Sequence, residues 1–337
     1  MQTRVAQLET GLADAVALLH AGQVVAFATE TVYGLGADAR QPETITRIYT
    51  AKGRPSYNPL IVHVAAPAEA RGYMATVPAF APELMAAFWP GPLTLVVPRG
   101  GALAPSVSAG LSTVALRCPE HPLAQALLRA FAGPIAAPSA NRSGFVSPTT
   151  AAHVLAELDG RIPLILDGGA SAIGLESTVV DLTTSPPTLL RPGGITAEQI
   201  RAITGQLIVP DTYTPPIEDL RSPGLLARHY APRKPAWRFT TADWPRVHAC
   251  LKSCMQPVTL ITDAPALHLD DPHETLLMPA SAMEYAAHLY DAVHRADAQS
   301  GAEIWVHMPD EHNGVWLAIH DRWQRATQPW TLREDRP

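Results

Sequence analysis

The sequence predicts an α/β protein of two domains: a twisted mixed sheet with surrounding helices, followed by a small Rossmann-like α/β domain. Three observations lead to this prediction. The chain has 337 residues, which is more than one domain usually contains. Short apolar strands and amphipathic helices mix along residues 1–206 without strict alternation. After a proline-rich segment at 207–236, strands and helices alternate again over residues 237–337.

The first domain, residues 1–206, is expected to hold most of the secondary structure. Thr10 can cap a helix over 10–21, and the string SPT at 147–149 can open another. The glycines at 34 and 36 follow a strand and are expected to form a turn. The remaining predicted helices are 42–50 and 121–131, and the predicted strands are 23–28, 60–64, 93–97, 113–116, 135–137, 164–166 and 178–182.

The segment 207–236 contains six prolines and shows no period, so it is expected to be a linker. Long irregular segments between compact parts are commonly functional or disordered, and the polar side chains here favour an ordered, functional linker. The second domain is expected to contain strands at 258–262 and 304–307 and helices at 280–298 and 315–326.

Composition excludes several classes of protein. The formal net charge of −6 argues against a general nucleic-acid-binding surface, which should be basic. No apolar run approaches the roughly 18 residues of a membrane span, and no signal segment opens the chain, so a cytoplasmic protein without membrane contact is expected. The three cysteines make no disulfide framework, and for His248, Cys250 and Cys254 helix packing is expected rather than a metal site.

Three short strings indicate a site for an anion, and phosphate fits them best. They are AKGRP at 51–55, PSAN at 138–141 and ESTV at 176–179. Lys52 and Arg54 supply two cations, and Ser139 and Asn141 supply a hydroxyl and an amide on a tight loop. Cations, hydroxyls and exposed backbone N–H groups are what phosphate recognition requires.

Other polar residues stand at predicted strand ends, where binding residues concentrate. Arg117 and Arg191 can each be a carboxylate or phosphate clamp or a surface ion pair. His63 taken alone is better explained as a packed core histidine. The Gly34–Gly36 string lacks the acidic residue that a dinucleotide fingerprint needs, and no P-loop or serine-nucleophile string is present.

Taken together, the longer strings resemble the YrdC-like family in its two-domain long form. The strings that carry the resemblance are TETVYGLG at 29–36, KGRPSYNPL at 52–60, WPGPLT at 89–94, PSANRSGFVSPT at 138–149, STV at 177–179, SPGLLARHYAP at 222–232, YAAHLY at 285–290 and AIHDR at 318–322. The resemblance covers nearly the whole chain and implies a YrdC-like sheet in the first domain. Two positions depart from the family pattern: Ala28, where proline is usual, and 225–227, where a basic linker contact is missing.

The resemblance implies a nucleotidyltransferase that makes threonylcarbamoyl-AMP and pyrophosphate from L-threonine, bicarbonate and ATP. Mg²⁺ is expected on the ATP, with no metal ion held by the protein. The product would pass to a tRNA threonylcarbamoyl transferase complex that forms N6-threonylcarbamoyladenosine, with weak or indirect tRNA binding by this chain.

The resemblance also implies roles for single residues. The signature set that would carry catalysis is Lys52, Arg54, Ser139 and Asn141. The residues that would contact ATP are Arg54, Asn58, Thr113, Ser139, Ser147 and Arg191, with His229 or Tyr230 from the linker. The residues that would contact threonine are Thr31, His63, Arg117, Ala137 through its backbone, and Ser177.

Two rival functions follow from the same fold. A carbamoyl-adenylate-forming domain of the hydrogenase-maturation type should carry acylphosphatase and zinc-finger segments, which the sequence lacks. A non-catalytic YrdC-like RNA-binding module would need a basic face, whereas residues 1–205 carry 13 Lys and Arg against 14 Asp and Glu. Pyrophosphate release that depends on threonine and bicarbonate separates the enzyme from the module.

Overall fold

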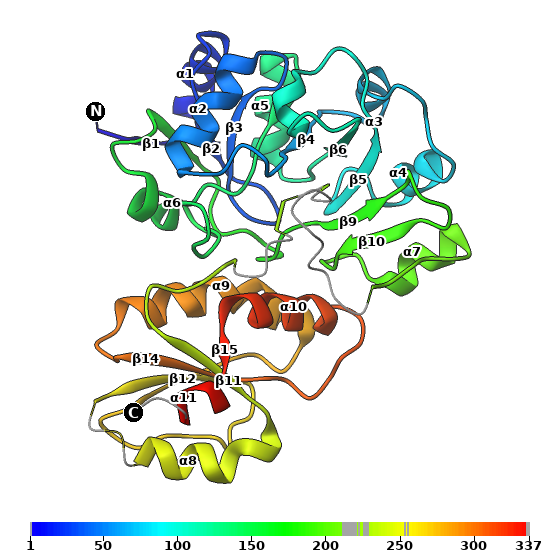
Figure 1. Cartoon of the computed structure of the whole chain (residues 1–337). Coiled ribbons are helices and arrows are strands. Elements are labelled where there is room, and N and C mark those ends of the chain that lie inside the picture. The colour runs from blue at the N-terminus through cyan, green and yellow to red at the C-terminus, as the bar shows by residue number, and fades with distance from the viewer. Residues whose placement is uncertain are drawn as a thin grey trace. The chain divides into compact units, whose positions relative to one another are not determined.

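A computed structural model describes residues 2–210, 221, 223–224, 229–252, 254 and 256–334. The chain divides into two compact units (Figure 1). Unit 1 comprises residues 1–143 and 147–226, and unit 2 comprises residues 144–146 and 227–337. The departure at 225–227 and ten residues of the predicted linker, 211–220, lie outside the described residues.

Unit 1 is built on a mixed sheet, as predicted. Its ten described strands are ordered β1-β8-β2-β3-β7-β4-β6-β5-β9-β10, with parallel and antiparallel neighbours. The strands are β1 Arg4–Gln7, β2 Val25–Phe27, β3 Gly34–Asp38, β4 Ile61–His63, β5 Leu93–Pro98, β6 Thr113–Arg117, β7 Ile135–Ala136, β8 Leu164–Asp167, β9 Thr178–Asp181 and β10 Thr188–Arg191. The helices are α1 Leu8–His20, α2 Pro42–Lys52, α3 Pro67–Ala70, α4 Ala81–Phe88, α5 Pro122–Phe131, α6 Ala151–Leu158 and α7 Ala197–Thr204, with 3-10 turns η1 Arg71–Tyr73 and η2 Pro105–Ser108.

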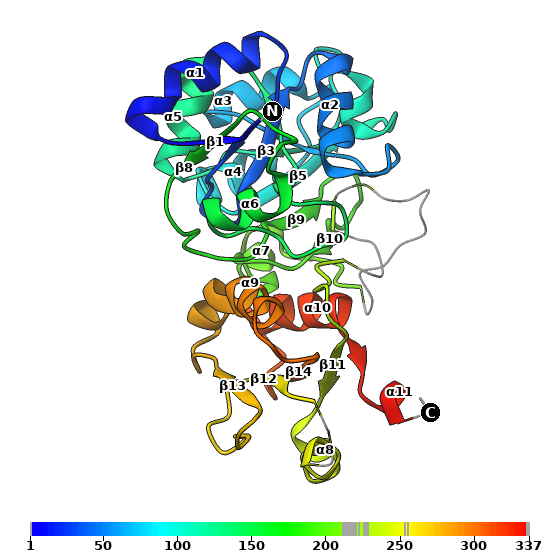
Figure 2. The ribbon, with the colours of Figure 1, turned by 90° about the vertical axis from the view of Figure 1, so that its left-hand side faces the viewer.

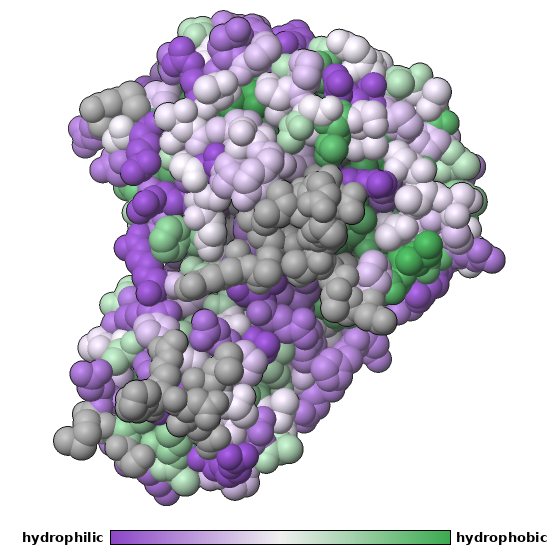
Figure 3. Space-filling model, in the orientation of Figure 1, coloured by the Kyte–Doolittle hydropathy of each residue, from purple (hydrophilic) through white to green (hydrophobic). Residues whose placement is uncertain are grey.

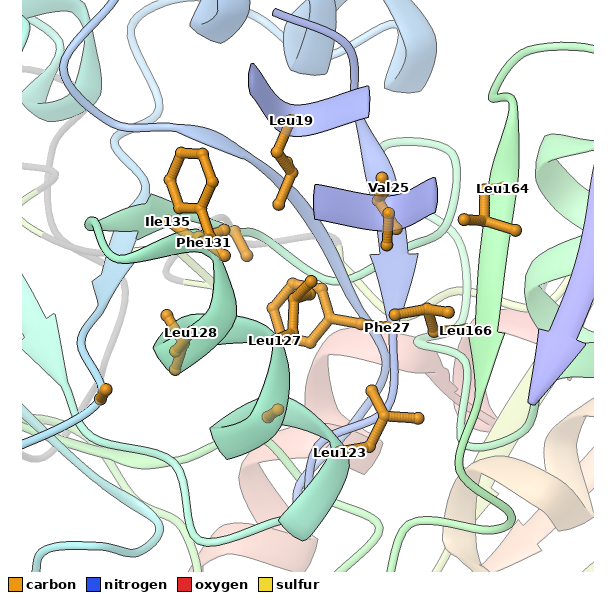
Figure 4. Close-up of a cluster of buried hydrophobic side chains, with 14 residues drawn as sticks. Leu19, Val25, Phe27, Leu123, Leu127, Leu128, Phe131, Ile135, Leu164 and Leu166 are labelled. Carbon is orange, nitrogen blue, oxygen red and sulfur yellow. The ribbon is translucent and has the colours of Figure 1, made fainter. Parts of the chain in front are cut away.

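Helices α1 and α5 close the core of unit 1 over one part of the sheet (Figure 4). Phe27 of β2 and Ile135 of β7 lie under Leu127 and Phe131 of α5, and all four are almost fully buried. Burial of side chains of this size stabilises a fold by roughly 1.5–3 kcal/mol each. A second buried cluster, made of Ile61, Val96, Ala115 and Val179, packs strands β4, β5, β6 and β9, whose ends carry polar residues described below.

Three local predictions for unit 1 were wrong. Helix α1 begins at Leu8 rather than at Thr10, and its N-cap residue is Gln7. The Gly34–Gly36 string is not a turn but part of β3, where a Cβ on Gly36 would lie 2.7 Å from Ile135 and Phe27, so glycine allows close packing. The helix expected to open at 147–149 begins at Ala151, where the Thr150 side chain accepts the capping hydrogen bond.

Unit 2 contains a parallel sheet with helices on both faces, as the restarted alternation predicts. The described strands are ordered β13-β12-β14-β11-β15. They are β11 Ala236–Phe239, β12 Val258–Thr262, β13 Glu274–Leu277, β14 Glu303–His307 and β15 Gln328–Pro329. The helices are α8 Trp244–Lys252, α9 Ala282–Ala298, α10 Trp316–Ala326 and α11 Thr331–Glu334, with the 3-10 turn η4 Thr241–Asp243.

Hydrophilic and near-neutral residues predominate among the coloured atoms of the face shown in Figure 3, and hydrophobic residues are interspersed among them. The large hydrophobic side chains exposed on the described residues are spread along the chain: Val5, Tyr57, Val77, Ile208, Leu277 and Met283. Scattered exposed hydrophobic residues are normal for globular proteins. Within the described part of the chain, no helix is both long and apolar enough to cross a membrane.

Candidate active site

Strand register gathers polar residues at one end of the sheet in unit 1. Parallel strands β4 and β6 place His63 opposite Arg117, and antiparallel β5 places Thr94 opposite the same arginine. Strand β9 runs parallel to β5 and starts at Thr178, so Ser177 lies at this end too. Residues that are opposite each other in a sheet point to the same face. His63, Arg117 and Thr94 therefore form one surface.

Arg117 is held by the residues that follow β2. Its Nη2 donates to Glu30 Oε1 at 2.6 Å, and its Nη1 donates to Thr31 Oγ1 at 2.8 Å. Arg117 is 4% exposed and Glu30 is 6% exposed, so this ion pair is buried. Burial alone would raise the pKa of Glu30, but the charge and hydrogen bond of Arg117 outweigh it and lower that pKa. The pair fixes the guanidinium in one orientation.

His63 lies beside Arg117 and stays neutral. Burial, with a further contribution from the Arg117 charge, lowers the pKa of its imidazole to about 3. Among the described residues, no hydrogen-bond partner reaches His63 Nδ1 or Arg117 Nε. Two buried polar atoms that lack a hydrogen-bond partner at one end of a sheet are unusual, because buried polar atoms are normally hydrogen-bonded.

Arg191, at the end of β10, adds a second cation to this end of the sheet. Its Nε donates to Ser177 O at 3.0 Å and its Nη2 to Ser177 Oγ at 3.1 Å. Ser177 Oγ also lies 2.7 Å from Thr94 Oγ1. The third guanidinium nitrogen, Nη1, donates to the carbonyl oxygen of Pro223 at 2.9 Å. A described part of the predicted linker thus contacts a predicted site residue within unit 1.

The signature residues Lys52, Ser139 and Asn141 do come together. Lys52 Nζ donates to Ser139 O at 2.6 Å and to Asn141 O. Ser139 Oγ in turn donates to Asn141 Oδ1 at 2.6 Å. Lys52 is 2% exposed, and burial, followed by the charge of Arg54, lowers its pKa well below the usual value. The lysine therefore ties the end of α2 to the 139–141 loop.

Arg54 and Asn58 lie on the loop between α2 and β4. Arg54 Nε donates to Asn58 O at 3.3 Å, and its Nη2 donates to Pro59 O at 3.0 Å. Asn58 is 1% exposed, and its Oδ1 has no partner among the described residues. The arginine is thus braced by its own loop.

The two groups flank the short strand β4. His63 and Arg117 lie at its carboxyl end, while Ala137, which precedes the 139–141 loop, donates its backbone N–H to Ile61 O at 2.9 Å. A strand of three residues is about 10 Å long. Thr113 begins β6, at the opposite end from Arg117, and is partly buried. The sheet surface thus carries cations and hydroxyls along its length.

Ser147 is bonded to Glu176, next to Ser177, whereas two further predicted residues belong to the other unit. Ser147 is fully buried, and its Oγ donates to Glu176 Oε1 at 2.6 Å. His229 and Tyr230 belong to unit 2, where the two rings meet edge to face with centroids 4.0 Å apart. Tyr230 also lies under Arg322, whose Cζ is 5.3 Å from the ring centroid.

Sequence reasoning missed Glu30, Thr94 and Glu176. Each lies inside or beside a quoted string, so position alone could have suggested them. Two are acidic, and a pattern of cations and hydroxyls that predicts an anion site gives no weight to acidic side chains. In the structure these acids hold the polar groups that face the site.

No metal centre is visible in the described residues. Among them, no three or more His, Cys, Asp or Glu side chains gather in a way that could hold a metal ion. Cys250 and Cys254 each accept a hydrogen bond from Arg333 at 3.5 Å, and His248 stacks on Trp244. In unit 1, Glu30 pairs with Arg117, and Glu176 Oε1 accepts a hydrogen bond from Ser147 Oγ.

Comparison with known proteins places this geometry in a family. Residues 17–193 match the Sua5/YciO/YrdC family model, which is described as telomere recombination. Residues 195–328 match a second model, described as the threonylcarbamoyl-AMP synthase C-terminal domain.

Two relatives and one solved structure match this chain over nearly its whole length. A threonylcarbamoyl-AMP synthase of Bacillus subtilis is 43% identical over 96% of this chain and 94% of its own length. The Pyrococcus abyssi threonylcarbamoyl-AMP synthase is 38% identical over 93% of both chains. A crystal structure of P. abyssi Sua5 complexed with L-threonine superposes with a TM-score of 0.90 at 36% identity, covering 96% of this chain and 98% of that one.

Proposed function

Because the chain belongs to the Sua5/YciO/YrdC family in its two-domain long form, we propose that it is a threonylcarbamoyl-AMP synthase, a nucleotidyltransferase that uses L-threonine, bicarbonate and ATP. The observation that carries the proposal is the row of cations and hydroxyls from one end of β4 to the other. Arg117 with His63 stands at one end, and Lys52 with Ser139 and Asn141 belongs to the other. Such a row suits an amino acid joined to a nucleotide.

Threonine would bind at the Arg117 end. A guanidinium recognises a carboxylate through two parallel N–H donors. Thr31 and Glu30 each accept one N–H, from Nη1 and Nη2, and Arg117 Nε is buried without a protein partner among the described residues. The Nε–H and the second N–H of a neighbouring Nη would form the pair of donors to the threonine carboxylate. The neutral His63 adds a hydrogen-bonding nitrogen. The residues that would contact threonine are Thr31, His63, Arg117, Ala137 through its backbone, and Ser177.

ATP would extend from the other end of β4 toward Arg191, which lies at the same end of the sheet as Arg117. Arg54 donates to the carbonyl oxygen of Asn58, and Lys52 would act mainly by holding the 139–141 loop, because its ammonium group donates to that loop's carbonyls. The residues that would contact ATP are Arg54, Asn58, Thr113, Ser139, Ser147 and Arg191. The contact of Arg191 with Pro223 supports a role for the linker, and we propose His229 or Tyr230 as its further ATP contact.

The chemistry needs positioning rather than a protein nucleophile. The threonine amine and bicarbonate give a carbamate and water. A carbamate oxygen then attacks the α-phosphorus of ATP, its bond to phosphorus forms, and the bond to pyrophosphate breaks. Negative charge gathers on phosphate oxygens, so fixed cations and N–H donors lower the barrier. Arg54 and Arg191 are the fixed cations, each braced by backbone carbonyls.

Three further proposals concern partners and place. Mg²⁺ would travel with ATP, held by phosphate oxygens. The product would pass to a tRNA threonylcarbamoyl transferase complex for N6-threonylcarbamoyladenosine formation, with weak or indirect tRNA binding by this chain. The place would be the cytoplasm, where tRNA is modified.

The experiment is a ligand-omission assay on the purified chain. Pyrophosphate release from ATP should require both threonine and bicarbonate. Serine, which lacks the threonine methyl group, serves as the matched substrate control and should react more slowly. Release that ignores threonine, or RNA binding without any release, would favour the non-catalytic module instead.

A further inference from the structure

Unit 2 has a crevice at the carboxyl ends of two neighbouring parallel strands. Strands β11 and β14 pair in register, with Phe239 opposite His307 at their ends. From β11 the chain continues into α8, and from β14 it continues into α10. Helices α9 and α10 cover one face of the sheet and α8 the other (Figures 1 and 2). Open α/β sheets bind their ligands beside two neighbouring strands whose following helices pack on opposite faces of the sheet.

A cavity of about 330 Å³ lies at this point. That volume falls at the lower end of the range for small-molecule sites. Its apolar lining includes Met308, Pro309 and Pro329. Its polar lining includes Asp310 and the His312–His320 pair, whose ring centroids are 4.1 Å apart. An apolar wall with a few convergent polar groups is typical of a binding site.

A hydrogen-bonded network makes the rim rigid. His307 Nε2 lies 2.9 Å from Thr241 Oγ1, and His307 Nδ1 lies 3.2 Å from Asp263 Oδ1. These contacts join the carboxyl ends of β11, β12 and β14. Thr241 Oγ1 also lies 3.0 Å from both oxygens of Asp310, which shows that this carboxylate accepts from a hydroxyl group. Neither the adenylation chemistry nor the predicted ATP and threonine residues involve this network.

The charged residues that line the cavity indicate which class of ligand it would bind. The lining contains two carboxylates, Asp243 and Asp310, and one guanidinium, Arg238. Arg238 already donates to the carbonyl oxygens of Gln324 and Thr327. The turn after β11, residues 240–243, has no glycine and places an acid before α8, whereas phosphate-binding turns are glycine-rich and open a helix with free N–H groups. A phosphorylated ligand is therefore disfavoured.

We propose that this switch-point cavity binds an unphosphorylated nucleoside, with its ring against Met308, Pro309 and Pro329 and its ribose hydroxyls on Asp310. A carboxylate after a strand is the usual partner of a ribose diol in such folds. The site is separate from the adenylation site proposed for unit 1, and its test does not depend on that activity.

The test uses the full chain, methyl-labelled at methionine, and adenosine as the probe. Adenosine should shift the Met308 methyl signal in a saturable way. Asp310→Asn should weaken this binding by at least ten-fold, and AMP should bind at least ten-fold more weakly than adenosine. Asp310 is exposed, so the variant should fold. Glu274→Gln, an exposed acid at the start of β13 and thus at the other edge of the sheet, is the matched control and should bind normally.

Three results would overturn the proposal. One is a Met308 signal that stays unmoved at the solubility limit of adenosine. Another is AMP binding as tight as that of adenosine, which would show that the site accepts phosphate. The third is binding by Asp310→Asn equal to that by Glu274→Gln, which would place the nucleoside elsewhere. The histidine C2–H signal of His312 gives a second local reporter if the Met308 signal is overlapped.

Discussion

His63 should make the stability of the chain depend on pH between about 6.5 and 3. The folded protein keeps the imidazole neutral because burial and Arg117 lower its pKa to about 3, against 6.5 in the unfolded chain. Below pH 6.5 the His63 ring binds a proton in the unfolded state but not in the folded state, so the free energy of unfolding falls as the pH drops. At pH 5 this amounts to about 2 kcal/mol less stability than at pH 8.

The perturbation is His63→Gln, which keeps a polar side chain but removes the titrating ring. Urea unfolding at pH 8 and pH 5 should show a loss of stability that is about 2 kcal/mol smaller in the variant than in the wild type. His268→Gln, at an exposed histidine, is the control and should leave the pH dependence unchanged. If the His63 ring titrates near pH 6.5 by NMR, or if both variants lose stability equally, the buried neutral state is refuted.

Three other substitutions test the proposed site. Arg54→Ala should slow threonylcarbamoyl-AMP formation at least ten-fold, or about 1.4 kcal/mol of barrier, in a folded protein; a near wild-type rate would remove Arg54 from the machinery. Arg117→Lys keeps the charge but loses the two-pronged donor, so calorimetry should show weaker threonine binding and a smaller change for ATP; equal weakening would argue against a carboxylate clamp. Glu30→Ala leaves Arg117 buried without its partner and should cost about 3 kcal/mol of stability at pH 7. Because the folded pKa of Glu30 is lowered, this difference should shrink as the pH falls below about 4.5, and a constant difference would show that the pair is not ionised.

The sequence predicts the strong periodic elements of the fold well. Strands β5, β6 and β12 and helices α5 and α10 fall within two residues of their expected bounds, because each has a clear apolar pattern and a defined end. Strand β3 was missed because Gly34 and Gly36 are poor strand formers, and only tertiary packing against Phe27 explains them. Strands β11, β13 and β15 are short, and their sequences lack strict alternation.

The sequence strings suggested which residues belong to the candidate site. They did not predict the hydrogen bonds that hold those residues in place. Cations and hydroxyls at strand ends suggested Lys52, Arg117 and Ser139, and the structure brings Lys52 to Ser139 and Arg117 to Thr31. The sequence could not show that Lys52 donates to a loop or that Glu30 holds Arg117, since both pairings join residues more than 80 positions apart. Sheet register decides such contacts, and no local pattern contains it.

The most direct measurement is pyrophosphate release from ATP by the purified chain, with threonine and bicarbonate added singly and together. The proposed function predicts release only when both are present, together with threonylcarbamoyl-AMP in equal amount by mass spectrometry. Release with ATP alone, or release without threonylcarbamoyl-AMP, would contradict it.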